Sequence, residues 1–185
     1  MTTTGGLYSR PDKLNDAQTV LYEVDMLRFA KERLLFPQSS RLEGDEWVHL
    51  EDFLLHYRNL IEFFSGKPKY PDDLSISRPE NLWPGQIPEK AVLDFMTRPA
   101  LWEKYDTPGN PQAISKYLHH CTMQRAIKKG WDVNAMYEDL RPIIEKLESL
   151  LPEYKSATQC RTPKLVASLS ADATSTASTR LVDLG

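Results

Sequence analysis

The chain lacks the features that mark several large protein classes. Its 185 residues include two cysteines, Cys121 and Cys160, which are too few for a disulfide framework and lack the spacing of a zinc site. No apolar run approaches the roughly 20 residues that a membrane helix requires. Residues 1–6 are rich in Thr and Gly instead of being basic and then apolar, so no secretory signal is visible. The sequence therefore predicts a cytoplasmic protein that makes no contact with a membrane.

An excess of charge is also missing. The formal net charge is −3, with 41% hydrophobic and 26% charged residues, and these are ordinary values for a globular domain. Such a balance excludes a general attraction to nucleic acid or to anionic lipid, so any binding of that kind must be local. The length fits one domain with a substantial core.

The sequence motifs of common enzyme classes are absent as well. The chain has no Walker-type phosphate loop, no dinucleotide-binding glycine pattern, no zinc-protease HExxH and no nucleophile elbow. Asp72 and Asp73 have side chains that can ligate a metal, but Pro-Asp-Asp is strong turn chemistry. We expect neither a metal nor a cofactor.

Apolar residues at three- and four-residue steps predict four main helices. The most regular steps belong to the second helix, and Gly66 after it suits a left-handed C-terminal cap. Pro142 falls inside the last helix and is expected to bend it. We expect the second, third and fourth of these helices to form the core. The predicted spans are 15–35, 48–64, 112–129 and 132–155.

Prolines interrupt the helical pattern in the middle of the chain. Residues 67–88 carry five prolines, which rules out a continuous helix there. A connection of this length is often functional, and we expect Trp83 to pin it to the body. Short helices are expected at 89–97 and from Pro99 through Trp102.

These patterns predict an all-α helical bundle of four main helices plus short helices, with a long Pro-rich loop. Residues 1–14 are polar and aperiodic, so they are predicted to form a disordered arm. Residues 15–155 form the predicted helical domain. Residues 156–185 turn to Ser, Thr and Ala and are predicted to be a disordered tail.

Helix 48–64 carries a histidine pair and a charged pair beside its apolar stripe. His49 and His56 lie roughly 10 Å apart along the axis, which is too far to chelate one metal ion unaided. Arg58 and Glu62 have the spacing of a surface ion pair. We interpret all four as polar contacts at the edges of a helix interface, and we keep His56 and Arg58 as candidate site residues.

Helix 112–129 carries the most informative polar residues. Lys116, His120 and Gln124 follow at i, i+4 and i+8, so they project from one face, while Thr122 and Arg125 flank the other side of the apolar stripe. A histidine that titrates near neutral pH acts as acid or base, and a neighbouring Lys or Arg holds a phosphate when RNA is cleaved without metal. The alternative interpretation is a half-buried polar seam without a ligand.

Four stretches resemble a family of small bacterial all-helical proteins that is similar to HEPN domains. They are residues 54–64 (LLHYRNLIEFF), 72–73 (DD), 115–122 (SKYLHHCT) and 130–132 (GWD), and the resemblance covers about residues 16–155. HEPN domains are helical nucleases and nucleotide-binding modules of toxin–antitoxin and phage-defence systems. The resemblance implies an HEPN-like bundle. It also implies a homodimer, because in HEPN nucleases the Arg and His of both protomers face one shared cleft.

The HEPN motif places an Arg a few residues before a catalytic His. His120 matches the His, but Ala113 stands at the Arg position and Ser115 at the position of an Asn. Losing a guanidinium that stabilises a phosphorane-like state typically costs several kcal/mol. The cationic candidates that remain are Lys116, Arg58 and Arg125.

We therefore expect a degenerate HEPN-like module that binds RNA or a partner protein without catalysis. One alternative is a metal-independent endoribonuclease of the toxin or defence type, with His120 as acid or base. Another is a structural scaffold. The expected ligand-binding residues, besides the cationic candidates, are His56, Thr122 and Gln124.

Overall fold

The computed structural model describes residues 13–35, 44–83, 85–110, 113–119 and 130–151. Every regular element within these ranges is a helix, and none is a strand. The protein is therefore all-α, as the sequence predicts. None of the helices in the described ranges combines the length and the apolar character needed to cross a membrane.

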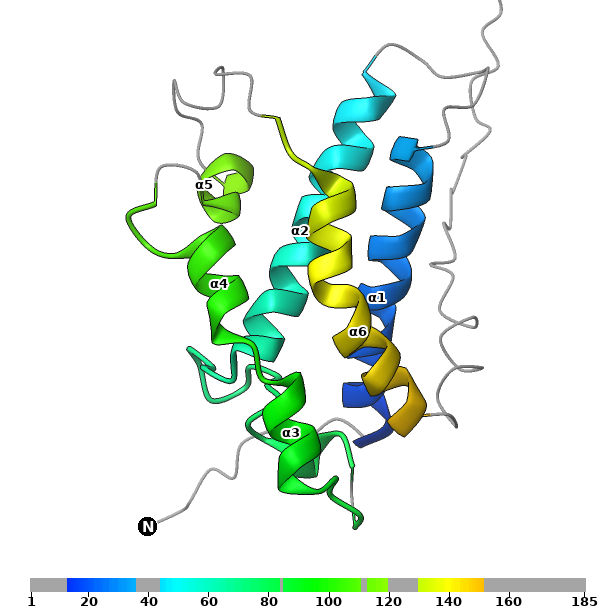
Figure 1. Cartoon of the computed structure of the whole chain (residues 1–185), viewed down its shortest axis with the longest axis vertical. Coiled ribbons are helices and arrows are strands. Elements are labelled where there is room, and N and C mark those ends of the chain that lie inside the picture. The colour runs from blue at the N-terminus through cyan, green and yellow to red at the C-terminus, as the bar shows by residue number, and fades with distance from the viewer. Residues whose placement is uncertain (1–12, 36–43, 84, 111–112, 120–129, 152–185) are drawn as a thin grey trace, which may run out of the picture.

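Helices α1 (Lys13–Leu35) and α2 (Asp45–Ser65) lie side by side and form the centre of the bundle (Figure 1). Their buried residues recur at three- and four-residue steps, so each helix turns one apolar face inward. Burying one such large side chain stabilises the fold by about 1.5–3 kcal/mol. The buried apolar residues that they share are Ala17, Val20, Leu21, Val24, Leu27 and Ala30 of α1, and Phe53, Leu54, Tyr57, Leu60, Ile61, Phe63 and Phe64 of α2.

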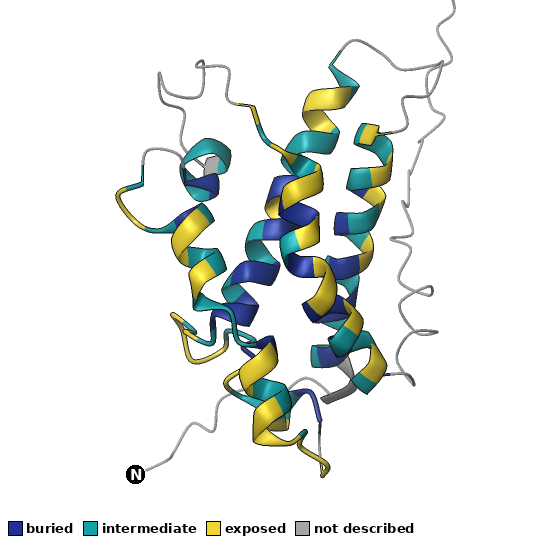
Figure 2. Cartoon of the chain, in the orientation of Figure 1, coloured by how far each residue is buried: buried dark blue, intermediate teal, exposed yellow. Residues whose placement is uncertain are grey.

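Helix α6 (Val133–Leu150) completes the bundle by packing against α1 and α2. Asp132 caps its N-terminus, and the Asp132 side chain accepts a hydrogen bond of 2.9 Å from the Ala135 amide. The Arg28 guanidinium of α1 donates two hydrogen bonds to the Glu148 carboxylate, at 2.6 and 3.0 Å. A bidentate pair of this kind fixes orientation as well as distance. Figure 2 shows buried positions where these three helices face one another and exposed positions on their outer sides.

The Pro-rich connection after α2 is held to the body at several points. Gly66 caps α2 with φ 71, a left-handed value that glycine adopts without strain. The Ile76 amide donates to the Phe63 carbonyl at 3.1 Å. After the short 3-10 helix η1 (Pro79–Asn81), Trp83 is buried and its indole donates to the Leu150 carbonyl at 3.3 Å. The predicted anchoring role of Trp83 is confirmed.

Three short helices follow and lead back along α2. They are α3 (Lys90–Met96), α4 (Pro99–Asp106) and α5 (Ile114–His119). Tyr105 of α4 meets the Tyr57 ring edge to face, with ring centroids 5.2 Å apart. Its hydroxyl donates to Asp139 of α6 at 2.7 Å. Helix α4 therefore bridges α2 and α6 along one flank of the bundle.

Several predicted boundaries need correction. Helix α1 begins at Lys13, so the last two residues of the predicted arm are helical. Helix α4 continues to Asp106 rather than ending near Trp102, because its second turn is held by the Tyr105 contacts. Helix α6 ends at Leu150 rather than near residue 155. Leu151 leaves the helical region because it precedes a proline, which disfavours the α conformation.

The composition of the core also differs from the prediction. The sequence favours helix 112–129 over the first helix as a core element, but α1 contributes six buried apolar residues because it packs along α2. Within 112–129 the structure describes residues 113–119, where Ala113 and Ile114 are buried. The predictions for residues 1–12 and 156–185, including the disordered tail, lie outside the described residues.

Candidate ligand-binding cavity

Two of the predicted cationic residues line one cavity. Arg58 of α2 and Lys116 of α5 border an open cavity of about 530 Å³ together with Lys69 from the Pro-rich connection. The rest of the lining comes from α2, from α4, from the turn between α4 and α5 and from the first turn of α5: Glu62, Trp102, Asp106, Thr107, Pro108, Gly109, Asn110, Ala113 and Ser115. His120, Thr122, Gln124 and Arg125 lie outside the described residues, and their placement stays a prediction.

Arg58 is held in one orientation at the wall of this cavity. Its Nε donates to Asp106 Oδ2 at 2.9 Å, and its Nη1 lies 3.1 Å from Glu62 Oε2. The guanidinium carbon is 5.4 Å from the centre of the Trp102 ring, a distance typical of cation–π contact. Arg58 is thus more than the surface partner of Glu62 that its spacing predicts.

Asp106 organises this arrangement, although no sequence pattern singles it out. Its side chain is 1% exposed, and its second oxygen accepts a hydrogen bond of 2.6 Å from the Ser115 amide at the beginning of α5. One carboxylate therefore fixes both the guanidinium and the first turn of α5. The Asp106-Thr-Pro-Gly sequence looks like an ordinary helix end and loop, and nothing in it indicates a partner 48 residues away.

The lining of the cavity has more positive than negative side chains. Its cations are Arg58, Lys69 and Lys116, and its carboxylates are Glu62 and Asp106. Both carboxylates already bind Arg58. The two lysines therefore supply the positive charge that faces a ligand. Lysine is a flexible point charge that suits phosphate oxygens.

His56 does not reach this cavity. It is 7% exposed in the α1–α2 interface, where Nδ1 lies 2.7 Å from Glu23 Oε2 and Nε2 lies 3.2 Å from Asp52 Oδ1. Burial alone lowers the pKa of His56, but the hydrogen bonds to Asp52 and Glu23 and their negative charges outweigh it and raise the pKa to about 9. At neutral pH the ring is a doubly protonated cation that joins two helices. The geometry agrees with the interpretation of His56 as an interface contact.

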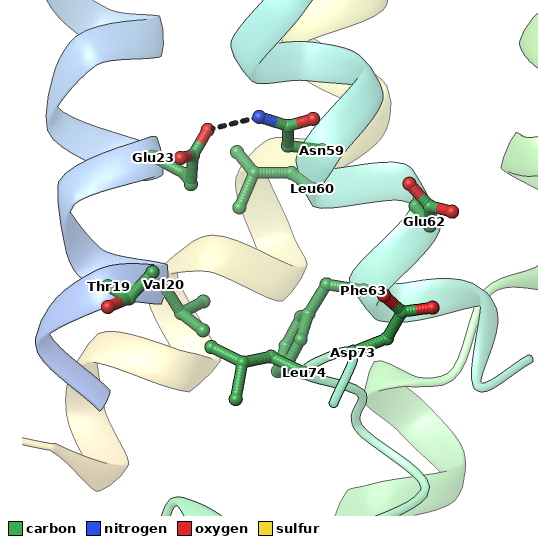
Figure 3. Close-up of a pocket in the computed structure, with 9 residues that line it drawn as sticks. All are labelled: Thr19, Val20, Glu23, Asn59, Leu60, Glu62, Phe63, Asp73 and Leu74. Carbon is green, nitrogen blue, oxygen red and sulfur yellow. Dashed lines mark hydrogen bonds between the residues drawn. The ribbon is translucent and has the colours of Figure 1, made fainter. Parts of the chain in front are cut away.

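A second, smaller cavity of about 180 Å³ lies between α1, α2 and the Pro-rich connection (Figure 3), and Glu62 borders it as well as the first cavity. Three carboxylates border it, and each has a structural partner. Glu23 accepts from Asn59 at 2.9 Å as well as from His56, and Glu62 binds Arg58. Asp73 accepts from the Lys69 and Tyr70 amides at 2.8 and 2.6 Å. Asp73 therefore has the turn role that its sequence context favours.

Metal-binding geometry is not found in the described part of the chain, where no group of three or more His, Cys, Asp and Glu side chains converges. Comparison of the chain with family models, with curated proteins and with solved structures gives no significant match.

Proposed function

We propose that this chain is a non-catalytic helical module, degenerate with respect to the HEPN nucleases that it resembles, and that it binds RNA at the cavity between α2, α4 and α5. The observation that carries the proposal is the convergence of Arg58, Lys69 and Lys116 on one cavity from three separate segments. Such local positive charge is what an acidic chain needs for binding a phosphate backbone.

Each part of the cavity suits a feature of single-stranded RNA. Lys69 and Lys116 supply ammonium groups for phosphate oxygens. Trp102 adds an aromatic side chain beside them, and stacking on aromatic rings is a common way to hold an unpaired base. Arg58, fixed by Asp106, keeps this wall of the cavity in one arrangement, so the wall does not have to be ordered on binding.

The same geometry argues against catalysis. Arg58 already donates to one carboxylate and lies in an ion pair with another, so little of its charge is left to stabilise a developing phosphorane. Ala113, at the motif position for an Arg, lines the cavity with a side chain that has no polar group. A binding role therefore needs fewer assumptions than a cleavage role.

The test is binding of a fluorescently labelled single-stranded RNA, followed by anisotropy in EDTA. We expect Lys69→Gln and Lys116→Gln each to weaken binding, and Lys90→Gln to leave it unchanged. Lys90 is the matched control because it lies on α3, is 86% exposed and is outside the cavity lining. Equal affinity in all three variants would place any RNA binding elsewhere.

The metal-independent endoribonuclease remains a second candidate because two of its predicted catalytic residues, Arg58 and Lys116, line one cavity. It is distinguished by incubating the same RNA with the protein in EDTA and analysing the products on a gel. The binding proposal predicts intact RNA. Cleavage that His120→Ala abolishes, with an unchanged thermal transition, would replace the binding proposal with the enzyme.

A further inference from the structure

An exposed tyrosine stands next to the cavity between α2, α4 and α5. Tyr70 directly follows Lys69 of the cavity lining in the Pro-rich connection, and it is 54% exposed. The Lys69 ammonium lies 5.1 Å from the centre of the Tyr70 ring, a distance typical of cation–π contact. A cation of the cavity lining therefore lies over one face of an aromatic residue that is more than half open to solvent.

Hydrogen bonds hold the turn that carries Tyr70. The Asp73 carboxylate accepts from the Lys69 and Tyr70 amides at 2.8 and 2.6 Å, and the Asp73 amide donates to the Tyr70 carbonyl at 3.2 Å. The Arg78 guanidinium donates to the Pro71 carbonyl at 2.7 Å. Ordering a loop on binding lowers affinity. A turn that is ordered before binding presents Tyr70 without this loss.

The same part of the chain lies beside α4, which carries the aromatic residue of the cavity. Lys67 Nζ lies 3.7 Å from Glu103 Oε1 of α4, and the neighbouring residue of α4, Trp102, lines the cavity together with Lys69. One aromatic residue and one lysine thus belong to the lining, and a second aromatic residue follows that lysine. Aromatic rings among cations are what single-stranded nucleic acid binds, because cations contact phosphates and rings stack on bases.

We propose that Tyr70 is a second base-stacking residue for single-stranded RNA, and that its base belongs to the nucleotide next to the one held in the cavity. The inference rests on the proposed RNA binding and adds a residue outside the cavity lining. Lys69 covers one face of the ring, so the base takes the opposite face. Stacking uses the ring and not the hydroxyl, and it contributes affinity without reading the base sequence.

The test compares two fluorescently labelled RNAs of equal length, one complete and one without bases, by anisotropy in EDTA. Tyr70→Ala should weaken binding of the complete RNA by about tenfold, within the range found when a stacked base loses its aromatic partner. It should leave binding of the abasic RNA unchanged, because every phosphate is retained. Tyr70→Phe should bind the complete RNA as wild type does, because the ring is retained.

Phe95 provides a matched control on α3. It is 43% exposed, and the Arg98 guanidinium carbon lies 4.9 Å from the centre of its ring. The pair thus repeats the contact between Lys69 and Tyr70, but neither residue lines the cavity. We expect Phe95→Ala to leave the affinity for both RNAs unchanged. Equal weakening by Phe95→Ala and Tyr70→Ala would overturn the proposal.

Salt dependence separates stacking from a role in positioning Lys69. If Tyr70 stacks on a base, Tyr70→Ala lowers the affinity and leaves the slope of log K against log salt unchanged. If the ring only holds Lys69 in place, the slope becomes shallower by up to about 0.7, the value for one phosphate contact. A shallower slope, or an equal loss of affinity for the abasic RNA, would overturn the stacking role.

The lysine variants distinguish failure of this inference from failure of the proposed function. Unchanged affinity in Tyr70→Ala, with weaker binding in Lys116→Gln, would overturn the role of Tyr70 and leave the cavity as the RNA site. Absence of RNA binding by wild type, or affinity that neither Lys69→Gln nor Lys116→Gln lowers, would overturn both.

Discussion

Asp106 and Arg58 are 48 residues apart in the chain, and Asp106 Oδ2 accepts a hydrogen bond of 2.9 Å from Arg58 Nε. The carboxylate is buried and the guanidinium is about one-fifth exposed. Because Asp106 also binds the Ser115 amide, this ion pair ties α2, α4 and α5 together at the wall of the cavity. It therefore has consequences for both stability and binding.

Replacing Asp106 with Ala should lower the free energy of unfolding by about 1–3 kcal/mol. The change leaves the Ser115 amide and part of the Arg58 guanidinium without their acceptor. Urea unfolding followed by circular dichroism measures the effect. Glu138→Ala is the control, since Glu138 forms an exposed pair with Arg141, and such pairs contribute at most about 1 kcal/mol. Equal losses in the two variants would show that the Asp106 pair has no special structural role.

The His56 contacts make stability depend on pH. The folded-state pKa is about 9, above the value near 6.5 of an unfolded chain. The folded protein therefore binds this proton more tightly, and the stabilisation is complete below about pH 6.5 and is lost as the pH rises through about 9. We expect a decrease on the order of 3 kcal/mol in the free energy of unfolding across this window.

The measurement compares urea unfolding at about pH 6 and about pH 10 for wild type, His56→Gln and His49→Gln. The decrease should disappear in His56→Gln and persist in His49→Gln. His49 takes no part in the contacts of His56 with Glu23 and Asp52, and its ring instead packs edge to face against Phe29, with ring centroids 6.3 Å apart. A decrease that remains in His56→Gln would assign the pH dependence to other groups.

Tyr57 and Tyr105 provide a matched pair of hydroxyls. The Tyr57 hydroxyl is buried and has no hydrogen-bond partner among the described residues, whereas the Tyr105 hydroxyl donates to Asp139. Tyr57→Phe should therefore be neutral or raise the free energy of unfolding by about 1 kcal/mol, and Tyr105→Phe should lower it by about 1 kcal/mol. Thermal and urea unfolding give both values. A clear loss of stability in Tyr57→Phe would show that the Tyr57 hydroxyl makes a stabilising hydrogen bond, with its neighbour Tyr105 as one candidate partner.

Ala113 offers a way to add the missing arginine. It is 5% exposed and lines the cavity, so an arginine placed there joins the existing cations. We expect Ala113→Arg to tighten RNA binding by about tenfold, the gain from one charge-assisted contact. Ala91→Arg, at an exposed position of α3, controls for added charge alone. Equal gains in both variants would mean that the cavity is not where RNA binds.

The sequence predicts the central helices well because their apolar periodicity is dictated by burial. Val20, Val24 and Leu27 of α1 and Leu140 and Leu147 of α6 all lie in the core where their spacing places them. The left-handed cap at Gly66 also follows from local chemistry. The early end of α6 could have been predicted from the proline at position 152, since the signal is local.

The cavity could be predicted only in part. The candidate residues Arg58 and Lys116 follow from their positions beside apolar stripes, but their common cavity depends on how α4 and α5 return to α2. Asp106 carries no sequence signal, because an ion pair between distant residues depends on tertiary packing and leaves no periodic pattern. The contact between His56 and Glu23 also joins residues that are distant in the chain, so it could not be predicted from the sequence either.

The salt dependence of RNA binding is the sharpest test of the proposed cavity. For single-stranded RNA, the slope of log K against log salt changes by about 0.7 for each phosphate that the protein neutralises. Wild type, Lys116→Gln and Lys90→Gln should be compared between about 50 and about 200 mM salt. We expect the slope to become shallower by about 0.7 in Lys116→Gln and to stay at the wild-type value in Lys90→Gln. Identical slopes for all three proteins, or no measurable binding by wild type at the lower salt concentration, would rule out phosphate binding at this cavity.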